Sequence, residues 1–358
     1  MLKKTTWFAL VLSAVLLIAG CGSKNENTGT NANANSGAGE QTENAASGTN
    51  AADDKTYTIA ISQIVEHPSL DATREGFLAA LKDGGLIEGE NLKVDYQNAQ
   101  NDQTNNTTIA QKIASDKPDL ALGIATPSAQ ALVKNITDSP VLFAAVTDPV
   151  ASKIVDNLDQ PGGNVTGASD TNPEATTKLV SFIADNFPNV KKVGLIINEG
   201  ETNAVIMAKK AEEEFGKKGI ELVKAAVTNT SEVQQAAESL IGRVDAFYIT
   251  LDNVVVTGAD AILKIAKKEK LPFFSSDRDT VEKGAFATVG FKYYDHGYQV
   301  GQMAVDVLKN GKNPGEMKVM MQEKLDLIIN AKAAADYGIE LTDAMKSAVA
   351  DQAENLIQ

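Results

Sequence analysis

The sequence predicts an α/β protein with two similar lobes, each built on a doubly wound parallel sheet. From Tyr57 onward, short β-rich runs alternate with helical patterns, as they do where helices flank a parallel sheet. The alternation forms two successive series along the chain. In addition, several helices are expected to begin with a polar residue and a proline soon after a strand, which is a favoured helix start.

The strand candidates are short apolar runs rich in β-branched residues. The first series comprises Thr58–Ser62, Leu92–Tyr96, Leu120–Ala125, Val141–Val146 and Val165–Ala168. The second series comprises Val193–Asn198, Glu221–Val227, Ala246–Thr250, Pro272–Ser276 and Ala285–Gly290. Apolar residues at helical spacing predict helices at Leu70–Lys82, Ala204–Lys217 and Ser231–Ile241. In the last of these, Ser231 and Gln234 have the spacing of a capping box.

The N-terminus has the pattern of a secretion signal. Lys3-Lys4 precedes an apolar run, Trp7–Ile18, which has about the length of a signal core and is too short to span a bilayer. The run ends in Ile18-Ala19-Gly20-Cys21, which resembles the bacterial lipobox. We therefore expect a lipoprotein signal peptide at residues 1–20 and lipid on Cys21. The alternative is an ordinary signal peptide ending near a cysteine, but this sole cysteine has no partner for an internal disulfide.

Residues 21–55 are expected to be the lipidated cysteine and a flexible tether. Gly22–Asp54 is rich in Asn, Gly, Ala, Ser and Thr and has no strongly apolar residue. Such a segment buries too little apolar surface to offset the entropy lost on ordering. It is typical of a flexible linker, and a simple cell-wall spacer would have the same composition.

The charge balance excludes some classes of partner. Without the two lysines of the predicted signal, the chain has 31 basic and 47 acidic side chains, a formal charge of −16. Nucleic acid requires basic surfaces for its phosphates, so we expect no nucleic-acid partner. Docking on anionic lipid through a basic face is disfavoured for the same reason.

Four polar–proline pairs suggest where a ligand binds. They are His67-Pro68, Thr126-Pro127, Asp148-Pro149 and Asn172-Pro173, and three of them directly follow strand candidates. In parallel α/β sheets, ligands bind beyond the carboxyl ends of the strands, where helix N-termini converge. The pairs therefore predict a shared binding edge that suits a carboxylate, although each pair by itself is explained equally well as a helix cap.

Motifs for catalysis or metal binding are missing from the sequence. It has no phosphate loop ending in Gly-Lys-Ser/Thr and no Gly-x-Ser-x-Gly elbow. The two histidines, His67 and His296, lack metal-ligand spacing. Asp277 and Asp279 have the chemistry for acid–base work, but lining a polar cleft or capping a helix is the commoner role of such pairs. We expect neither an enzyme, nor a cofactor, nor a metal site.

Several segments together resemble the TrpX-like group of ABC-transporter substrate-binding lipoproteins. The resemblance covers about Tyr57 to Ile339. Its motifs are Gln63–Asp71, Ala125–Gln130, Thr147–Val150, Pro161–Gly167, Thr228–Gln235, Asp252-Asn253, Gly284-Ala285 and Tyr293-Tyr294.

This resemblance implies a fold of the type I periplasmic binding protein kind, with two lobes joined by a three-segment hinge. The hinge segments are expected near Ala168–Thr171, Gly290–Tyr293 and Asn313–Lys318. The first lobe would then comprise residues 56–168 plus 293–315, including a helix at Tyr294–Asn310. The second would comprise 169–292 plus 316–345, including a last strand near Leu325–Asn330.

The function implied by the resemblance is capture of a small molecule between closing lobes and delivery to an ABC permease with its ATPase. Some members of the group bind aromatic amino acids, tryptophan above all. We expect a monomer at the extracytoplasmic face of the cell membrane, attached through lipid on Cys21. A ligand sensor for a membrane receptor, an exported enzyme and a structural surface lipoprotein are the alternatives.

The resemblance also suggests roles for residues on the matched motifs. Thr126 and Ser128 would hold a carboxylate, and Asp148, Asp252 and Asn253 would meet an ammonium group. Tyr293 would stack on an aromatic ligand. The remaining expected ligand-binding residues, which form the rim and the facing wall, are Glu66, His67, Leu70, Asn198, Asn203 and Asp277.

Two departures from the group's pattern affect the choice of ligand. This chain has Asn198-Glu199-Gly200 where a proline often follows the asparagine, and Leu251 where threonine often precedes the Asp-Asn pair. The first adds a charge to the predicted cleft, and the second removes a hydroxyl. Tryptophan is therefore an expectation of the group rather than a prediction from these residues.

Overall fold

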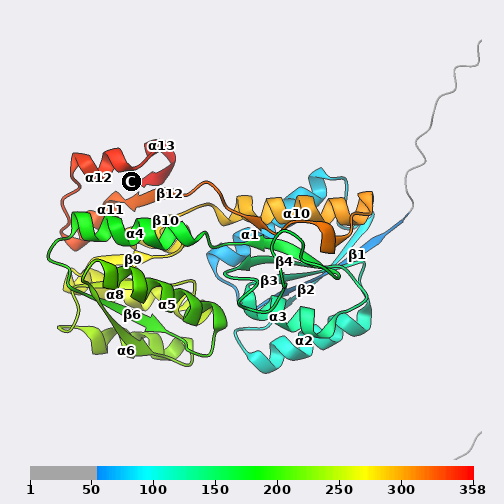
Figure 1. Cartoon of the computed structure of the whole chain (residues 1–358), viewed down its shortest axis with the longest axis horizontal. Helices are drawn as coiled ribbons and strands as arrows, with labels where there is room; N and C mark the ends of the chain where they lie inside the picture. The colour runs from blue at the N-terminus through cyan, green and yellow to red at the C-terminus, as the bar shows by residue number, and fades with distance from the viewer. Residues whose placement is uncertain (1–54) are drawn as a thin grey trace, which may run out of the picture. The chain divides into compact units, whose positions relative to one another are not determined.

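The computed structural model describes residues 55–358. The predicted signal peptide, the predicted lipidation of Cys21 and the tether up to residue 54 lie outside the described residues. None of the helices in the described part combines the length and apolar character that crossing a membrane requires. Its two sheets confirm the predicted class, two α/β lobes (Figure 1).

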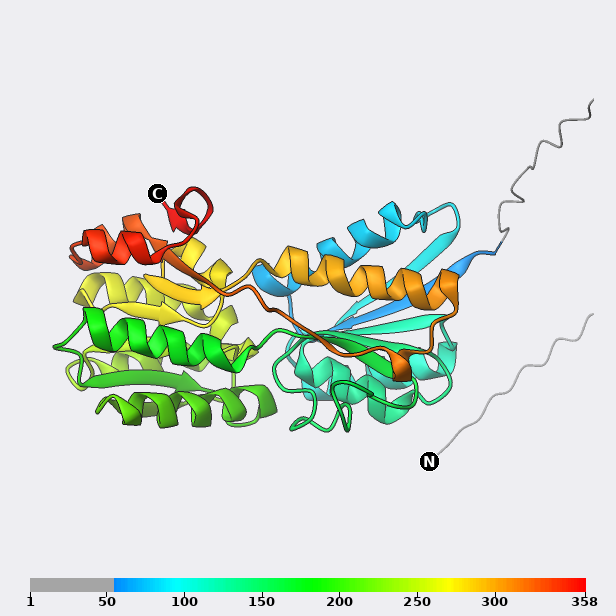
Figure 2. The same ribbon diagram turned by 45° about the horizontal axis from the view of Figure 1, so that its top comes forward.

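The first lobe is a wholly parallel sheet with the strand order β11-β5-β4-β3-β1-β2. Its strands are β1 (Tyr57–Gln63), β2 (Leu92–Asn98), β3 (Leu120–Ile124), β4 (Val141–Val146), β5 (Val165–Ser169) and β11 (Met320–Met321). Every residue of β3 and β4 is buried, because helices cover both faces of the sheet. These helices are α1 (Pro68–Asp83) and α10 (Tyr293–Asn310) on one face, and α2 (Gln103–Asp116) and α3 (Thr126–Asn135) on the other (Figure 2).

Close packing fixes where α10 begins. Any Cβ at Gly76 of α1 would overlap the backbone carbonyl oxygen of Tyr294, and any Cβ at Gly297 would overlap that of Thr73. The two helices therefore touch backbone to backbone. This contact places the first turn of α10, with Tyr293 and His296, against the carboxyl end of the sheet.

The second lobe has a seven-stranded sheet with the order β13-β12-β10-β9-β8-β6-β7, in which β12 alone runs antiparallel to its neighbour β10. Its strands are β6 (Lys192–Ile197), β7 (Glu221–Ala226), β8 (Ala246–Ile249), β9 (Phe273–Ser275), β10 (Ala287–Gly290), β12 (Asp326–Asn330) and β13 (Leu356–Ile357). Its helices are α4 (Pro173–Asn186), α5 (Thr202–Lys217), α6 (Val233–Leu240), α7 (Asn253–Thr257), α8 (Ala259–Glu269), α9 (Arg278–Lys283), α11 (Ala331–Tyr337), α12 (Asp343–Ala348) and α13 (Gln352–Asn355). Two short 3-10 helices, Thr230–Glu232 and Pro314–Glu316, complete the described elements.

The chain passes between the lobes three times: after β5, after β10, and between β11 and β12. The first two crossings lie where the sequence predicts them. The third lies after Met321 rather than within Asn313–Lys318. Residues 316–321 belong to the first lobe because Met320 pairs with Ala168 and the Thr166 hydroxyl donates to the carbonyl oxygen of Met317 at 2.7 Å.

The second lobe also extends beyond the predicted residue 345. Leu356 pairs with Ile329 at the edge of the sheet. The guanidinium group of Arg278, at the start of α9, donates to Oδ1 of Asn355 at 2.7 Å and to the carbonyl oxygen of Glu354 at 2.8 Å. The segment 352–357 therefore completes the sheet and holds the first residue of α9.

Two local helix predictions were wrong. Asp148-Pro149 begins a turn rather than a helix, with the Asp148 carboxylate accepting the N–H of Ala151 at 2.9 Å. Ser231 does not cap its helix, because the side chain of Asn229 caps the preceding 3-10 turn and Glu232 accepts the N–H of Thr228 at 2.7 Å.

Candidate functional site

A pocket of about 330 Å³ lies between the lobes, where strand ends and helix starts meet. Seven of the twelve predicted ligand-binding residues line it: His67, Leu70, Thr126, Asn203, Asn253, Asp277 and Tyr293. The structure adds seven that the sequence did not single out for binding: Ser69, Ala125, Ala145, Thr147, Asp170, Leu251 and Val256.

The first-lobe wall is built on two helix N-termini. His67 precedes α1 with an extended backbone and makes no side-chain cap, while Ser69 and Leu70 lie in the first turn. Thr126 is the first residue of α3, and its hydroxyl accepts the N–H of Thr147 at 3.4 Å. The first turns of both helices have N–H groups without intrahelical partners, and they favour a negative charge nearby. This wall therefore suits a carboxylate.

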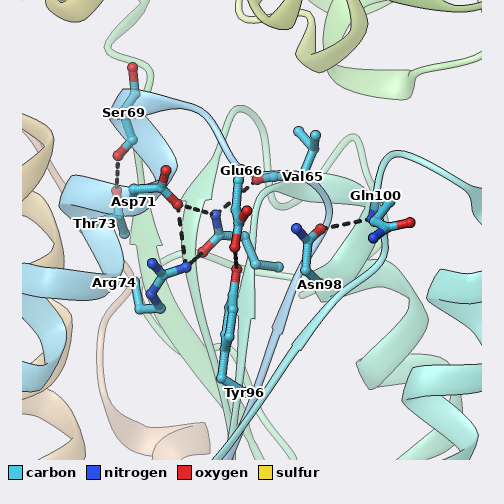
Figure 3. A network of polar contacts seen from close by, with 10 residues as sticks. Val65, Glu66, Ser69, Asp71, Thr73, Arg74, Tyr96, Asn98 and Gln100 are labelled. Carbon is cyan, nitrogen blue, oxygen red and sulfur yellow. Dashed lines mark hydrogen bonds and ion pairs between the residues drawn. The ribbon is translucent and has the colours of Figure 1, made fainter.

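A polar network fixes α1 relative to the sheet (Figure 3). The side-chain amide of Gln63, the last residue of β1, donates to Oδ1 of Asp71 at 2.8 Å and accepts from Arg74 at 2.9 Å. The Arg74 guanidinium lies 4.2 Å from the ring centroid of Tyr96. Because these contacts join β1 and β2 to the first turns of α1, they hold the helix start that presents His67 and Ser69.

The second-lobe wall is organised by Glu201, a buried carboxylate that the sequence analysis missed. Glu201 accepts the side-chain N–H groups of Asn203 at 3.0 Å and of Asn253 at 2.6 Å. It also accepts the backbone N–H of Val254 at 3.2 Å, near the start of α7. Glu201 thereby sets the directions in which the two pocket amides point. In the sequence, Glu201 could have been recognised as a candidate because it directly precedes α5 and lies in the loop that follows β6.

Acidic groups gather at the base and on the second-lobe side of the pocket. The Tyr293 hydroxyl donates to Oδ2 of Asp170 at 3.1 Å, and burial raises the pKa of Asp170 to about 6. Asp277 caps α9 by accepting the N–H of Thr280 at 2.7 Å. Burial, and then the charge of Asp277, raise the pKa of nearby Asp279 to about 6. No lysine or arginine is among the residues lining the pocket.

Two polar atoms of the pocket lining are buried and have no hydrogen-bond partner: Nδ1 of His67 and Oδ1 of Asn203. Burial lowers the pKa of His67 despite the opposing charge of Asp277, so its imidazole is neutral at pH 7. A buried polar group without a partner destabilises a protein. A bound molecule with complementary polar groups would remove that cost.

Three predicted site residues of the first lobe lie outside this pocket. Glu66 is exposed and accepts the hydroxyl of Tyr96 at 3.0 Å. Ser128 is buried, and its hydroxyl lies 3.3 Å from Oδ1 of Asn106, which is on α2. Asp148 borders a separate hollow of about 730 Å³.

Two predicted residues of the second lobe also lie outside it. Asn198 caps its own loop by accepting the N–H of Gly200 at 2.9 Å. Asp252 caps α7 through the N–H of Val255 at 3.1 Å and accepts the N–H of Asn198 at 2.5 Å. Burial, and then the charge of Glu201, raise the pKa of Asp252 to about 8. Both side chains therefore shape the loops behind the pocket.

Across residues 55–358, no three or more His, Cys, Asp or Glu side chains gather in a way that would hold a metal ion. The pocket instead offers a carboxylate-rich wall, two helix N-termini and neutral amide and imidazole groups. This arrangement suits a small zwitterion or amine.

Comparison with known proteins identifies a matching family and a similar protein that cover most of the chain. The model of the family described as ABC transporter substrate binding protein matches residues 58–353. The tyrosine-binding protein of Clostridioides difficile (strain R20291) is 38% identical over 334 residues, which make up 92% of this chain and 91% of that protein.

Solved structures also match over most of the chain. A conserved domain protein from Vibrio cholerae is 40% identical with a TM-score of 0.79, covering 83% of this chain and 99% of that one. An ABC domain in complex with L-Trp from Streptococcus pneumonia is 31% identical with a TM-score of 0.78, again covering 83% and 99%. A ligand-free, open substrate-binding protein with adhesive properties from Clostridium difficile is 38% identical with a TM-score of 0.62, covering 84% and 98%.

Proposed function

Because this chain belongs to the family of ABC transporter substrate-binding proteins, we propose that it captures an aromatic amino acid outside the cytoplasmic membrane and delivers it to an ABC permease. Proteins of this family bind solutes and are not enzymes. The named relatives, one tyrosine-binding and one solved with L-Trp, support an aromatic ligand.

The observation that carries the proposal is the charge pattern of the pocket. Asp170 and Asp277 line it, and no lysine or arginine does. An ammonium group would neutralise these carboxylates, since opposite charges within a few ångströms stabilise each other strongly where water is excluded. The ligand carboxylate would then lie against the N-termini of α1 and α3, and the free Nδ1 of His67 and Oδ1 of Asn203 would take up further polar groups.

The arrangement of the lobes supports capture by closure. The ligand-free, open structure is closer in sequence than the L-Trp complex, yet its TM-score is lower, 0.62 against 0.78. This difference supports a lobe arrangement in this chain that is nearer to the ligand-bound one. Closure of this kind buries a ligand between two half-sites that bind it weakly on their own.

Attachment to the membrane is part of the same proposal. Lipid on Cys21 would anchor the chain, and residues 22–54 would let the lobes reach ligand and permease. A single acyl chain binds membranes only weakly, so firm attachment needs more than one chain on this cysteine.

The test is binding by the purified full chain after unfolding and refolding to remove carried-over ligand. Thermal unfolding and calorimetry would compare tyrosine, tryptophan and phenylalanine with the other amino acids. A ligand at ~100 times its dissociation constant should add roughly 2.7 kcal/mol to the free energy of unfolding. Two analogues refine the result: indole-3-propionate, which lacks the ammonium group, should fail to bind, and tryptamine, which lacks the carboxylate, should bind more weakly than tryptophan. Binding of another class of compound alone would refute the aromatic ligand.

A further inference from the structure

Two alanines that line the pocket have left-handed backbones. Ala125 has φ of 75° and Ala145 has φ of 54°. Ala125 directly follows β3, and Ala145 is the second-to-last residue of the adjacent strand β4, where the pairing with β5 shifts register. Residues with a Cβ rarely adopt positive φ, and such strained positions persist only where surrounding contacts hold them. The contacts that hold Ala145 therefore decide the shape of the first-lobe wall.

The contact at Ala145 comes from His296 of α10. The backbone N–H of Ala145 donates to Nε2 of His296 at 2.9 Å, and the imidazole is completely buried. Burial lowers the pKa of His296 to about 4, so the ring is neutral at physiological pH. A neutral imidazole has one donor and one acceptor nitrogen. Since Nε2 accepts from Ala145, the ring proton lies on Nδ1.

Nδ1 of His296 faces the third crossing between the lobes. It lies 3.3 Å from Nε2 of Gln322, a nitrogen that also lies 3.2 Å from Oε1 of Gln299. With the amides of Gln322 and Gln299 both turned by 180°, Oε1 of Gln322 accepts the Nδ1 proton and the amide of Gln299 donates to the same oxygen. The backbone carbonyl oxygen of Gln322 in turn accepts from Nδ2 of Asn172, the cap of α4 just after the first crossing, at 3.2 Å. A chain of contacts thus runs from Ala145 through His296 to two of the three crossings.

We propose that His296 is a positioning residue for ligand capture: it holds Ala145 in the left-handed conformation that forms the pocket wall and couples this wall to the hinge at Gln322. His296 is not among the residues lining the pocket, so it acts on the ligand only through Ala145. This inference rests on the proposed function, because its main test measures ligand affinity.

A double-mutant cycle tests the coupling to Ala145. His296→Leu removes the acceptor and should weaken binding of the preferred aromatic amino acid by about tenfold, the scale of one lost buried hydrogen bond. Glycine adopts positive φ without a contact that holds it there. In a chain that already has Ala145→Gly, H296L should therefore weaken binding much less. Lys153→Gly is the matched control, since Lys153 also has a left-handed backbone, with φ of 58°, in an exposed turn outside the pocket. It should not alter the effect of H296L.

His296→Gln provides the conservative variant, because a glutamine amide reaches about as far as Nε2 and offers both an acceptor and a donor. It should restore most of the affinity lost in H296L. Equal losses in H296L with and without A145G, or no rescue by H296Q, would overturn the positioning role. Unfolding scans of each ligand-free variant identify a protein that has failed to fold.

Nitrogen-15 NMR of the imidazoles gives a readout that needs no ligand. The chain has only two histidines, so His67→Phe assigns the His296 signals. The proposal requires the Nδ1–H form of His296 at pH 7, and the Nε2–H form would refute it. Failure of the wild-type chain to bind any aromatic amino acid would instead refute the proposed function and leave this NMR result standing.

Discussion

The Ser69 hydroxyl of the first lobe lies 3.4 Å from Oδ1 of Asp277 in the second lobe. Asp277 keeps its capping contacts with Thr280 and its contact with Ser275 inside its own lobe. The contact with Ser69 is therefore available only when the lobes are together, and it joins the N-terminus of α1 to that of α9.

Ser69→Ala should weaken ligand binding by roughly two- to tenfold, because one ordinary hydrogen bond of the closed form is lost, ~0.5–1.5 kcal/mol. Calorimetry of the variant measures this. The matched control is Ser239→Ala, an exposed serine whose hydroxyl contacts only its own helix at Ala236. A loss of affinity equal in both variants would contradict a role for the contact in closure.

Asp170→Asn should weaken binding of an amino acid by about 1.5–3 kcal/mol, the usual value of a hydrogen bond to a charged group. Asp170 lines the pocket, whereas Asp148, the ammonium partner expected from the sequence, borders a different hollow. Asp148→Asn is thus the natural comparison and should leave affinity unchanged within about twofold, as surface substitutions usually do. The reverse outcome would restore Asp148 to the site.

Ligand binding should release protons at pH 5.5. Burial raises the pKa values of Asp170 and Asp279 to about 6, so both carboxyls are mostly protonated there. A bound ammonium favours their ionised forms, so affinity should rise as pH increases from about 5 to 7. Calorimetry in two buffers of different ionisation enthalpy measures the release. Proton uptake, or an enthalpy independent of the buffer, would count against an ammonium at this wall.

Asp252→Asn should flatten the dependence of stability on pH. The carboxyl pKa is raised to about 8 in the folded chain. Its stabilising effect is therefore complete below its unfolded value and is lost as pH rises through 8, by at most about 1.4 kcal/mol per pH unit.

Urea unfolding at pH 5, 6.5 and 8 would compare the wild-type chain with this variant. The matched control is Asp260→Asn, an exposed carboxylate on α8, which should keep the wild-type slope. If the free energy of unfolding of D252N depended on pH as strongly as that of the wild type, a group other than Asp252 would cause the pH dependence.

The sequence predicted the elements better than the contacts between them. Strand–helix alternation predicted the two lobes, because buried parallel strands read as apolar runs, whereas the crossings were expected only from the family resemblance. The third crossing was misplaced because β11 is only two residues long and has no hydrophobic pattern of its own. Its membership in the first sheet depends on pairing with Ala168 and Ser169.

The candidate site was predictable where a residue starts a helix after a strand, as with His67, Thr126 and Asp277. Ser128 is two residues beyond Thr126, and a helix turns by more than half a circle over that spacing, so Ser128 faces α2 instead. Asp170 was missed because its partner Tyr293 is 123 residues away. At Asp148-Pro149 the cap signal was present and apolar residues follow at helical spacing, but the segment forms turns whose residues Ile154 and Val155 still pack into the core.

The contact of Arg278 with Asn355 and Glu354 has a practical meaning for anyone who purifies or truncates this chain. The guanidinium group is held by the segment 352–357 and stands beside the pocket carboxylate of Asp277 in the sequence. Proteolytic trimming of this segment would remove β13 from the edge of the second sheet and would also release Arg278 beside the pocket, so it should weaken ligand capture. An affinity tag attached ahead of residue 55 would leave this segment unchanged.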